Sequence, residues 1–309
     1  MTVHEMPADV SGEAPRQGRS RVGLAPALFL LPFLIPFVLF YLLPIIYAFW
    51  RSLHKITRTG GVFGTPQEQF AGLAQFGNVL DDADFRSSVV RVLVFGVVQV
   101  PVMLVTALIL ALLLDSTLAR FKRTFRIAYF LPYAIPGVIA ALIWGFIYSP
   151  NLSPIVSALG DVGVHPQFLS SQLVLWSIAN VVTWTYTGYN MLILYSALQA
   201  IPQEIYEAAK IDGAGNWAIA TRIKIPSILP ALVLTAVFSI IGTLQLFTEP
   251  IVFSKIATTI TSTYTPNMVV LNASQNNYDY AAALSVTLAL ATFVLSFGFL
   301  KITQRRAES

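Results

Sequence analysis

Seven polar or aromatic side chains lie inside otherwise apolar stretches of the chain, where they could bind a solute. They are Asn180, Trp184, Tyr186, Asn190, Gln245, Thr248 and Glu249. Sugars are bound by amide and hydroxyl groups with aromatic faces alongside, so this set is suited to a sugar path. The alternative is that each side chain only hydrogen-bonds a neighbouring helix, which contributes about 0.6 kcal/mol on average. The aromatic ones could also lie in an interfacial belt.

Glu249 is the ionisable residue placed most deeply in an apolar run. A charge at the centre of a membrane helix costs about 2.5–3.5 kcal/mol on insertion scales, so we expect Glu249 to face water or protein rather than lipid. Gln245, Thr248 and Glu249 are three and four residues apart, which predicts that they share one helical face. Pro250 predicts a bend in the same helix.

Two interpretations of Glu249 remain open at this point. It either lines a sugar path near its outer end, or forms a salt bridge with Arg86, Arg91 or a partner chain.

The chain carries no recognisable motif for catalysis or for nucleotide binding. It contains no Gly-Lys pair, hence no P-loop, and neither His-Glu-x-x-His nor Gly-x-Ser-x-Gly occurs. No Cys is present, and His4, His54 and His165 lie far apart, so we expect no metal and no other cofactor. The ionisable relays that a secondary transporter needs are almost absent from the apolar runs. Uphill transport by this chain would therefore draw energy from a partner, and the chain itself is not expected to be an enzyme.

Composition and apolar runs place these residues in a polytopic membrane protein with an all-α fold. Of 309 residues, 56% are hydrophobic and 11% charged, whereas a soluble chain has about 25% charged residues. The net charge of +4 is too small to indicate nucleic-acid binding. A span needs about 20 apolar residues. Six transmembrane helices are predicted, at residues 24–50, 88–114, 127–148, 172–198, 227–253 and 280–300.

The distribution of basic residues predicts the orientation of these spans. Six spans place both termini on one side, and 13 of the 19 Lys and Arg residues lie inside if that side is cytoplasmic. Cytoplasmic loops carry an excess of Lys and Arg, so both termini are expected in the cytoplasm. Residues 1–23 and 301–309 are then cytoplasmic tails, the first of them predicted to be disordered because it is polar and rich in Pro, Gly and Ser.

A polar segment between the fourth and fifth spans is itself built to fold; we call residues 199–226 the elbow. Glu207, Ala208 and Ala209 favour a helix, and Asp212-Gly213 is a turn signal in which glycine supplies a positive φ. A second helix can restart at 216, so two short helices joined by a sharp turn are predicted. From its residues alone, this segment could also be an amphipathic loop that rests on the bilayer surface.

The pattern of the elbow resembles the EAA loop of the membrane subunits of bacterial ABC importers, in the carbohydrate-uptake, MalF/MalG-like branch. The resemblance rests on Glu207-Ala208-Ala209, then Asp212-Gly213-Ala214, then Trp217. Further similarities lie at residues 70–76, which resemble a short interfacial helix that precedes the family core, and at 243–249, which resemble the segment facing the translocation path. The resemblance implies the fold of a type I importer permease, with the core at residues 70–300 after a first helix and outer loop at 24–69.

The same resemblance implies partners and site roles. The family's membrane subunits pair, usually as a heterodimer in carbohydrate uptake. Each places its coupling helix against one subunit of a cytoplasmic ATPase dimer, and an extracytoplasmic sugar-binding protein delivers the solute. The implied coupling residues here are Glu207, Ala208, Ala209, Asp212, Gly213, Ala214 and Trp217.

The chain is therefore expected to be a permease subunit in the cell membrane, among lipids, for a sugar or oligosaccharide. Two alternatives stay open: an importer of another solute, such as a glycerol phosphate or a peptide, and a membrane assembly protein without a transport path. Co-purification with an ATPase separates the last alternative from the others.

Overall fold

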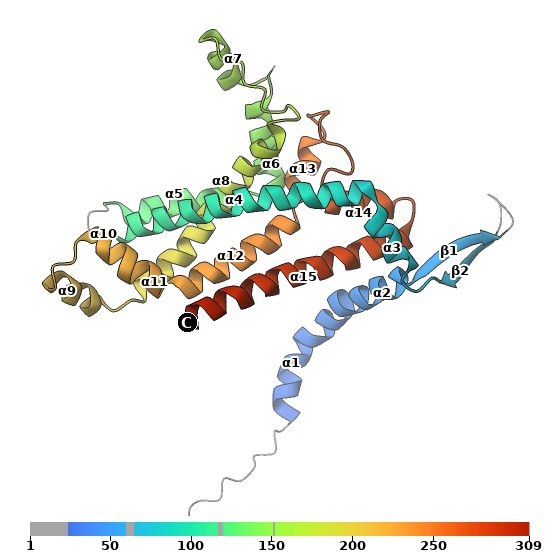
Figure 1. Cartoon of the computed structure of the whole chain (residues 1–309), viewed down its shortest axis with the longest axis horizontal. Coiled ribbons are helices and arrows are strands. Elements are labelled where there is room, and N and C mark those ends of the chain that lie inside the picture. The colour runs from blue at the N-terminus through green and yellow to red at the C-terminus, as the bar shows by residue number, and fades with distance from the viewer. Residues whose placement is uncertain (1–23, 60–64, 117–119, 151, 309) are drawn as a thin grey trace, which may run out of the picture. The chain divides into compact units, whose positions relative to one another are not determined.

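The computed structural model describes residues 24–59, 65–116, 120–150 and 152–308, and most of them are helical (Figure 1). The described residues belong to two units, 1–47 and 48–309. The first unit contains α1 (Leu24–Phe37), the π-helical η1 (Val38–Leu42) and the start of α2 (Leu43–Ser52). The predicted tail 1–23 lies outside the described residues.

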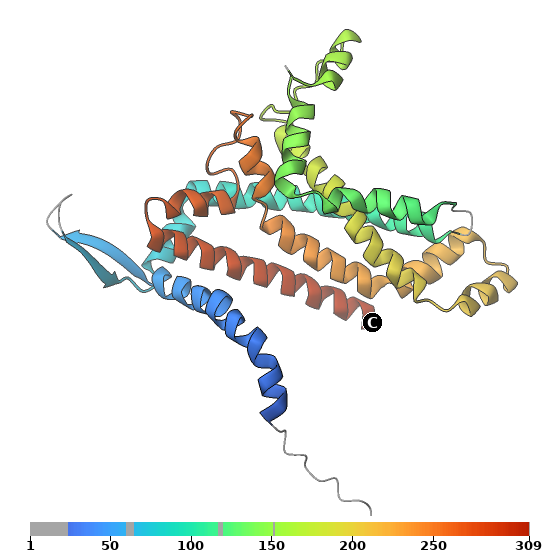
Figure 2. The ribbon, with the colours of Figure 1, turned by 180° about the vertical axis from the view of Figure 1, so that it is seen from behind.

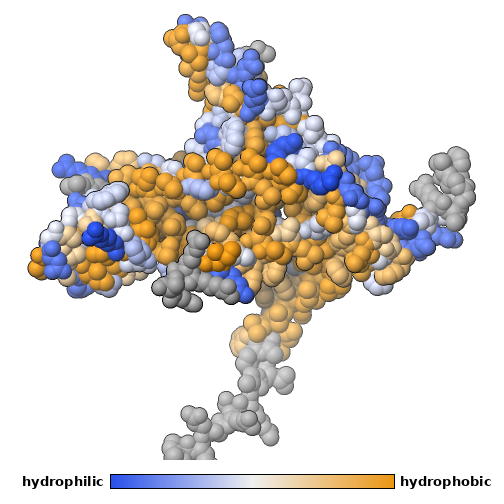
Figure 3. Space-filling view, viewed as in Figure 1, coloured by the Kyte–Doolittle hydropathy of each residue, from blue (hydrophilic) through white to orange (hydrophobic). Residues whose placement is uncertain are grey.

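The second unit is built on long helices that lie side by side (Figures 1 and 2). These are α4 (Ala83–Asp115), α5 (Lys122–Ala134), α8 (Val174–Gln199), α12 (Leu229–Leu244) and α15 (Tyr278–Glu308). α4 packs against α8 and α12, α5 against α8, and α12 against α15. Apolar residues cover the middle of this unit's face, and hydrophilic ones gather toward α3 and the β-strands (Figure 3). Such a belt is expected where lipid replaces water as the solvent.

Four helical stretches of the described residues are long and apolar enough to cross a membrane. They are Leu28–Ser52, Ala83–Asp115, Leu229–Phe253 and Tyr278–Thr303. A bent pair of helices adds a fifth. α8 coincides with the predicted fourth span and has 26 residues, but its polar side chains lower its hydropathy. The chain is thus a multi-pass membrane protein, whereas the count of six spans is not confirmed by length and composition alone.

The predicted third span, residues 127–148, is not one straight helix. α5 ends at Ala134, α6 (Gly137–Tyr148) follows, and the two axes meet at 95°. Ile135 has φ −79° and ψ 128°, an extended conformation. The residue before a proline is disfavoured in the helical region, so Pro136 accounts for the position of the break. The expectation of an uninterrupted span was therefore wrong here.

The predicted fifth span is interrupted as well. α12 ends at Leu244, and α13 (Thr248–Phe253) begins after three residues that are not helical. The bend was expected at Pro250, but that proline lies in the first turn of α13, where its missing N–H has no partner to lose. The helix ends before the proline, and α13 starts anew.

Three segments expected to be loops contain regular structure. The first outer loop holds the antiparallel hairpin β1 (His54–Thr59) and β2 (Thr65–Phe70), and then α3 (Ala74–Asp81). α3 overlaps the short helix expected at residues 70–76 only at 74–76, because Phe70 ends β2 and residues 71–73 are not helical. The two other segments hold α7 (Pro154–Asp161) and α14 (Pro266–Ser274). Hairpin aside, the fold is all-α, as predicted.

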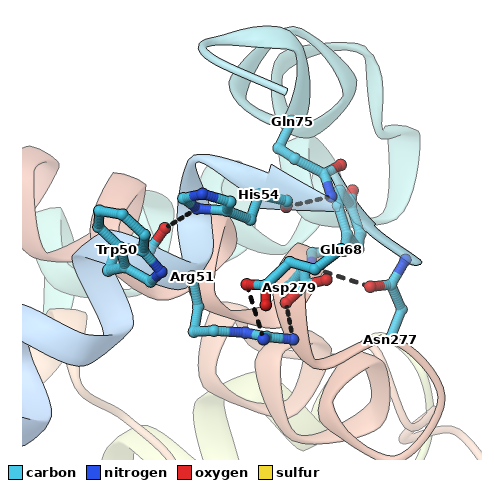
Figure 4. Close-up of polar contacts among 8 residues, drawn as sticks. Trp50, Arg51, His54, Glu68, Gln75, Asn277 and Asp279 are labelled. Carbon is cyan, nitrogen blue, oxygen red and sulfur yellow. Dashed lines mark hydrogen bonds and ion pairs between the residues drawn. The ribbon is translucent and has the colours of Figure 1, made fainter. Parts of the chain in front are cut away.

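A buried polar cluster joins the hairpin to the start of α15 (Figure 4). Arg51 forms ion pairs with Glu68, at 3.1 Å, and with Asp279, whose side chain is almost fully buried. Nearby, Gln75 donates a hydrogen bond to the carbonyl oxygen of His54. A buried carboxylate that lost its cation would be strongly destabilising, so the Arg51–Asp279 pair fixes the end of α2 to the start of α15. Arg51 links the hairpin to both through the more exposed Glu68.

Candidate functional site

A cavity of about 510 Å³ lies between α4, the α5–α6 bend, α8 and the α12–α13 break. Five of the seven predicted path residues line it: Tyr186, Asn190, Gln245, Thr248 and Glu249. Ligand cavities typically occupy about 300–1,000 Å³, so this one is large enough for a sugar unit. The structure therefore brings most of the predicted set to one place.

The three residues from the fifth span reach the cavity in a way that the sequence did not predict. Gln245 follows the last residue of α12, and Thr248 and Glu249 open α13. They do not share one face of a continuous helix, so that prediction was wrong. The break between the helices, rather than helical periodicity, brings the three side chains to the cavity wall. Non-helical backbone at membrane depth is tolerated where it lines a cavity or is buried in protein.

Amide groups on α4 and α8 provide hydrogen-bonding capacity. Gln99 donates to the Thr183 hydroxyl at 3.3 Å, and Asn190 donates to the carbonyl oxygen of Tyr186 at 3.1 Å. The side-chain oxygen of Gln99 is buried and has no hydrogen-bond partner among the described residues. A buried acceptor without a partner costs free energy, and a hydroxyl group of a bound solute would satisfy it.

Three tyrosines form an aromatic surface on one side of the cavity. The rings of Tyr133 and Tyr189 stack with centroids 4.6 Å apart, and Tyr186 meets Tyr133 edge-on at 5.8 Å. Together they offer both ring faces and hydroxyl groups. Tyr133 comes from α5 and was not among the predicted residues, because its place beside α8 follows from close helix packing that sequence spacing does not reveal. Gln99 and Tyr189, which are likewise polar residues in apolar runs, also line the cavity.

Asn180 and Trp184 lie elsewhere on α8. Asn180 donates a hydrogen bond to the Tyr148 hydroxyl at 2.8 Å, and Trp184 meets Trp144 edge-on at 5.6 Å. Both partners belong to α6. The two residues are four apart and so share a helical face, which here is turned to α6. They do not line the cavity, and a role for them in a solute path stays a prediction.

Glu249 is buried, with 8% of its surface exposed, and it lines the cavity. The salt bridge considered from the sequence is not present among the described residues. Arg91 instead donates to the carbonyl oxygen of Tyr264 at 2.6 Å, and its guanidinium lies 4.4 Å from the centroid of that ring. The cavity position agrees with the interpretation in which Glu249 lines a sugar path, and that role stays a prediction.

The elbow forms the two short helices that were predicted. α9 (Gln203–Ile211) is followed by a tight turn and by α10 (Asn216–Ile219), η2 (Ala220–Lys224) and α11 (Ile225–Ser227). Gly213 has φ +83°. Its N–H bonds to the carbonyl oxygen of Lys210 at 3.0 Å, and the N–H of Ala214 bonds to that of Ala209 at 2.9 Å. These two bonds are the Schellman motif, which ends a helix at a residue in the left-handed region.

One side of the elbow is packed and the other is open. Ile219 is buried, with 5% of its surface exposed, whereas Trp217 and Ile211 are 81% and 86% exposed. Glu207 and Asp212 are exposed too. The second helix therefore packs on the core through Ile219, and Trp217 belongs to an uncovered surface. Uncovered large apolar side chains with acidic neighbours are typical of a protein-interaction site.

Comparison with known proteins gives a consistent result over most of the chain. The family described as "Binding-protein-dependent transport system inner membrane component" matches residues 83–307. The lactose transport system permease protein LacF of Rhizobium radiobacter is 32% identical over 87% of this chain and 91% of its own length. The arabinooligosaccharides transport system permease protein AraP of Bacillus subtilis (strain 168) is 28% identical over 98% of this chain and 96% of its own.

A solved structure with the same fold comes from a bacterial ABC transporter for import of the acidic polysaccharide alginate. Its matching chain superposes with a TM-score of 0.77 at 20% identity, covering 91% of this chain and 95% of that one. The predicted fold of an ABC importer permease is thereby confirmed.

Proposed function

The chain belongs to the family of binding-protein-dependent transport system inner membrane components, and we propose that it is the permease subunit of an ATP-driven importer for a sugar or oligosaccharide. In this proposal it forms half of a translocation path, beside a second permease subunit. A separate cytoplasmic ATPase dimer supplies the energy, and an extracytoplasmic binding protein delivers the sugar. Both chain termini are cytoplasmic, in keeping with the excess of basic residues on that side.

One observation carries the proposal: the cavity that combines amides, tyrosine rings and a carboxylate at a break in the helices. Groups of these types hydrogen-bond sugar hydroxyls and pack on sugar rings. The named relatives are permeases for lactose and arabinooligosaccharides, which supports a carbohydrate over a peptide or a glycerol phosphate.

The mechanism that we propose is mechanical. Closure of the ATPase dimer pushes on the exposed surface of the elbow, and the helices attached to the elbow alter the access to the cavity. Glu207 offers a carboxylate to a basic residue of the ATPase, and Ala208 and Ala209 allow close approach. The Asp212-Gly213-Ala214 turn fixes the angle between the two short helices, and Trp217 contributes apolar contact area. None of these steps requires bond chemistry by this chain.

Transport by the reconstituted complex tests the proposal. Co-expression with a candidate ATPase and a candidate binding protein should yield a complex that hydrolyses ATP and accumulates one sugar from a panel of di- and oligosaccharides. A stable complex that accumulates no solute from sugar, peptide and glycerol phosphate panels would indicate an assembly protein.

Glu207→Lys is expected to weaken the association with the ATPase, because it places a cation where the proposal requires an anion. A charged pair at a protein interface typically loses a few kcal/mol when one partner is removed. We expect at least tenfold less ATPase to co-purify, while sugar binding by the isolated binding protein stays unchanged. Glu204→Lys, an exposed carboxylate one turn earlier, is the matched control and should have the smaller effect. Equal ATPase yield for Glu207→Lys and wild type would contradict the role.

Thiol labelling is expected to show the elbow on the cytoplasmic side. The chain has no cysteine, so single cysteines can be introduced against a clean background. An impermeant reagent applied outside should label a cysteine at the exposed position 262, but not at 120 or 216, until the membrane is permeabilised. Labelling of 216 from outside would overturn both the orientation and the ATPase contact.

Glu249→Gln is expected to alter sugar handling without loss of assembly. The substitution keeps the shape and the hydrogen-bonding capacity of the side chain and removes its charge. Because no ion pair of Glu249 exists among the described residues, the complex should assemble in normal yield. Transport should continue with a severalfold change in apparent KM or in sugar preference. A complex that fails to assemble would show that the carboxylate is structural.

A further inference from the structure

A buried polar joint connects the elbow to the two helices behind the cavity. Asp115, the last residue of α4, forms an ion pair with Lys224 of η2 through one carboxylate oxygen. The other oxygen accepts a hydrogen bond at 2.5 Å from Gln199, the last residue of α8. The two charged side chains are only 7% and 15% exposed. One carboxylate thus links the ends of α4 and α8 to η2, in the C-terminal half of the elbow.

The N-terminal half of the elbow, α9, reaches the same joint. The Lys224 ammonium lies 5.1 Å from the centroid of the Tyr206 ring, which belongs to α9. The Tyr206 hydroxyl is buried and has no hydrogen-bond partner among the described residues. Burial, and then the nearby Asp115 carboxylate, raise the pKa of Tyr206, so its ring remains neutral beside the cation. Both halves of the elbow therefore contact one cation.

Asp115 is unfavourably placed unless it has such partners. A negative charge at the C-terminal end of a helix is opposed by the helix dipole, and a buried carboxylate needs a cation and hydrogen bonds. The Lys224 ammonium and the Gln199 amide meet this need. Displacement of Lys224 would leave Asp115 buried without a cation, so the three elements are held to move together.

The joint leads directly to the cavity. α4 carries Gln99 and Met103, and α8 carries Tyr186 and Asn190, all in the cavity wall. These two helices are linked again at that depth, since Gln99 bonds to Thr183 and the Asn190 amide contacts the sulfur of Met103 at 3.6 Å. α4 and α8 thus form one body that is fastened to the elbow at one end and lines the cavity further along.

We propose that Asp115 and Lys224 are positioning residues that transmit movement of the elbow to the α4–α8 pair. This inference rests on the proposed function and deepens it. ATPase docking uses the exposed surface of the elbow, whereas transmission uses the buried joint. If the joint is lost, the ATPase should therefore still dock, but transport should fail. Loss of a contact needed only for docking would instead impair both.

The test uses the complete complex in proteoliposomes, with a cysteine-free ATPase. Lys224→Gln and Asp115→Asn should retain the ATPase, hydrolyse ATP with little dependence on the sugar-loaded binding protein, and lose at least tenfold in transport. Arg222→Gln, which removes an exposed cation two residues from Lys224, is the control and should transport as the wild type does. The exchange Asp115→Lys with Lys224→Asp should recover part of the transport.

A cleavable tether keeps the test decisive if the single variants assemble poorly. Asp115→Cys with Lys224→Cys, bridged by a short bis-methanethiosulfonate reagent, should regain transport when tethered and lose it when the same sample is reduced. Identical transport before and after reduction would overturn the inference, as would wild-type transport by Lys224→Gln. A wild-type complex that hydrolyses ATP but transports no solute would instead overturn the proposed function.

Discussion

Gly188→Ala is expected to abolish transport and to lower the stability of the protein, with the largest effect of a methyl group added at any glycine that the structure describes. Gly188 is buried in α8, where α5 crosses it. A Cβ at this position would lie 1.8 Å from the carbonyl oxygen of Tyr129 and 2.5 Å from its carbonyl carbon. Both atoms are backbone, so no rotamer change can relieve the overlap, and the two helices must separate.

The expected magnitude follows from the nature of the contact. Overpacking a core typically costs about 1–3 kcal/mol, and a backbone collision belongs at or above the upper end of that range. We expect the thermal midpoint in detergent to fall by roughly 5–10 °C. The functional loss should exceed the loss of folded protein, because separation of α5 from α8 also moves Tyr133 away from its stack on Tyr189.

Gly298→Ala is the matched control. It adds the same methyl group within a membrane helix, but no atom lies within 4 Å of the added Cβ. Alanine is also the better helix former, so this variant should be as stable as the wild type or slightly more so. Equal stability and transport for the two variants would show that α5 does not approach α8 as closely as the structure has it.

These two glycines show which parts of the fold can be predicted from sequence patterns. Hydrophobic runs located the long helices, because burial in lipid requires about 20 apolar residues whatever their neighbours are. The close approach at Gly188 could not be predicted, since it depends on which helix crosses α8 at that height. Small residues permit such approaches in membranes without specifying the partner.

The two breaks in the helices mark another limit of sequence patterns. Residues 127–148 were predicted as one span, and the 95° bend within them was not predicted. At Gln245–Phe247 the helix is broken although these residues include no proline. The prediction of a shared face assumed a continuous helix and was therefore wrong. Five of the seven predicted path residues nevertheless line the cavity, because polarity in an apolar run is costly unless the side chain faces a cavity or a partner.

The elbow was the part best predicted by its residues. Its helices, its turn and the positive φ of Gly213 all follow from local sequence, because a Schellman motif is formed by neighbouring residues and needs no tertiary contact. What the sequence could not supply is the joint at Asp115 and Lys224, whose two members are 109 residues apart. Local rules thus predict the shape of the elbow, and only the fold reveals how it is fastened.

Gly213→Val is expected to uncouple ATP hydrolysis from transport, or to prevent assembly with the ATPase. No atom lies within 4 Å of a Cβ added to Gly213, so the substitution causes no clash. Its whole effect comes from φ, which is +83°. A β-branched residue held in this region costs about 1–3 kcal/mol, enough to favour a different turn and a different angle between α9 and α10. Transport should fall at least tenfold.

Gly213→Asn separates backbone strain from surface contact. It adds a side chain of similar size to the same open position, but asparagine adopts the left-handed region far more readily than valine does. If the angle of the turn is what matters, Gly213→Asn should retain most of the transport and a normal ATPase response to the loaded binding protein, because the two Schellman hydrogen bonds can still form. If instead the ATPase packs directly on Gly213, valine and asparagine should impair assembly to the same extent, and the turn would act as a contact surface rather than as a rigid angle.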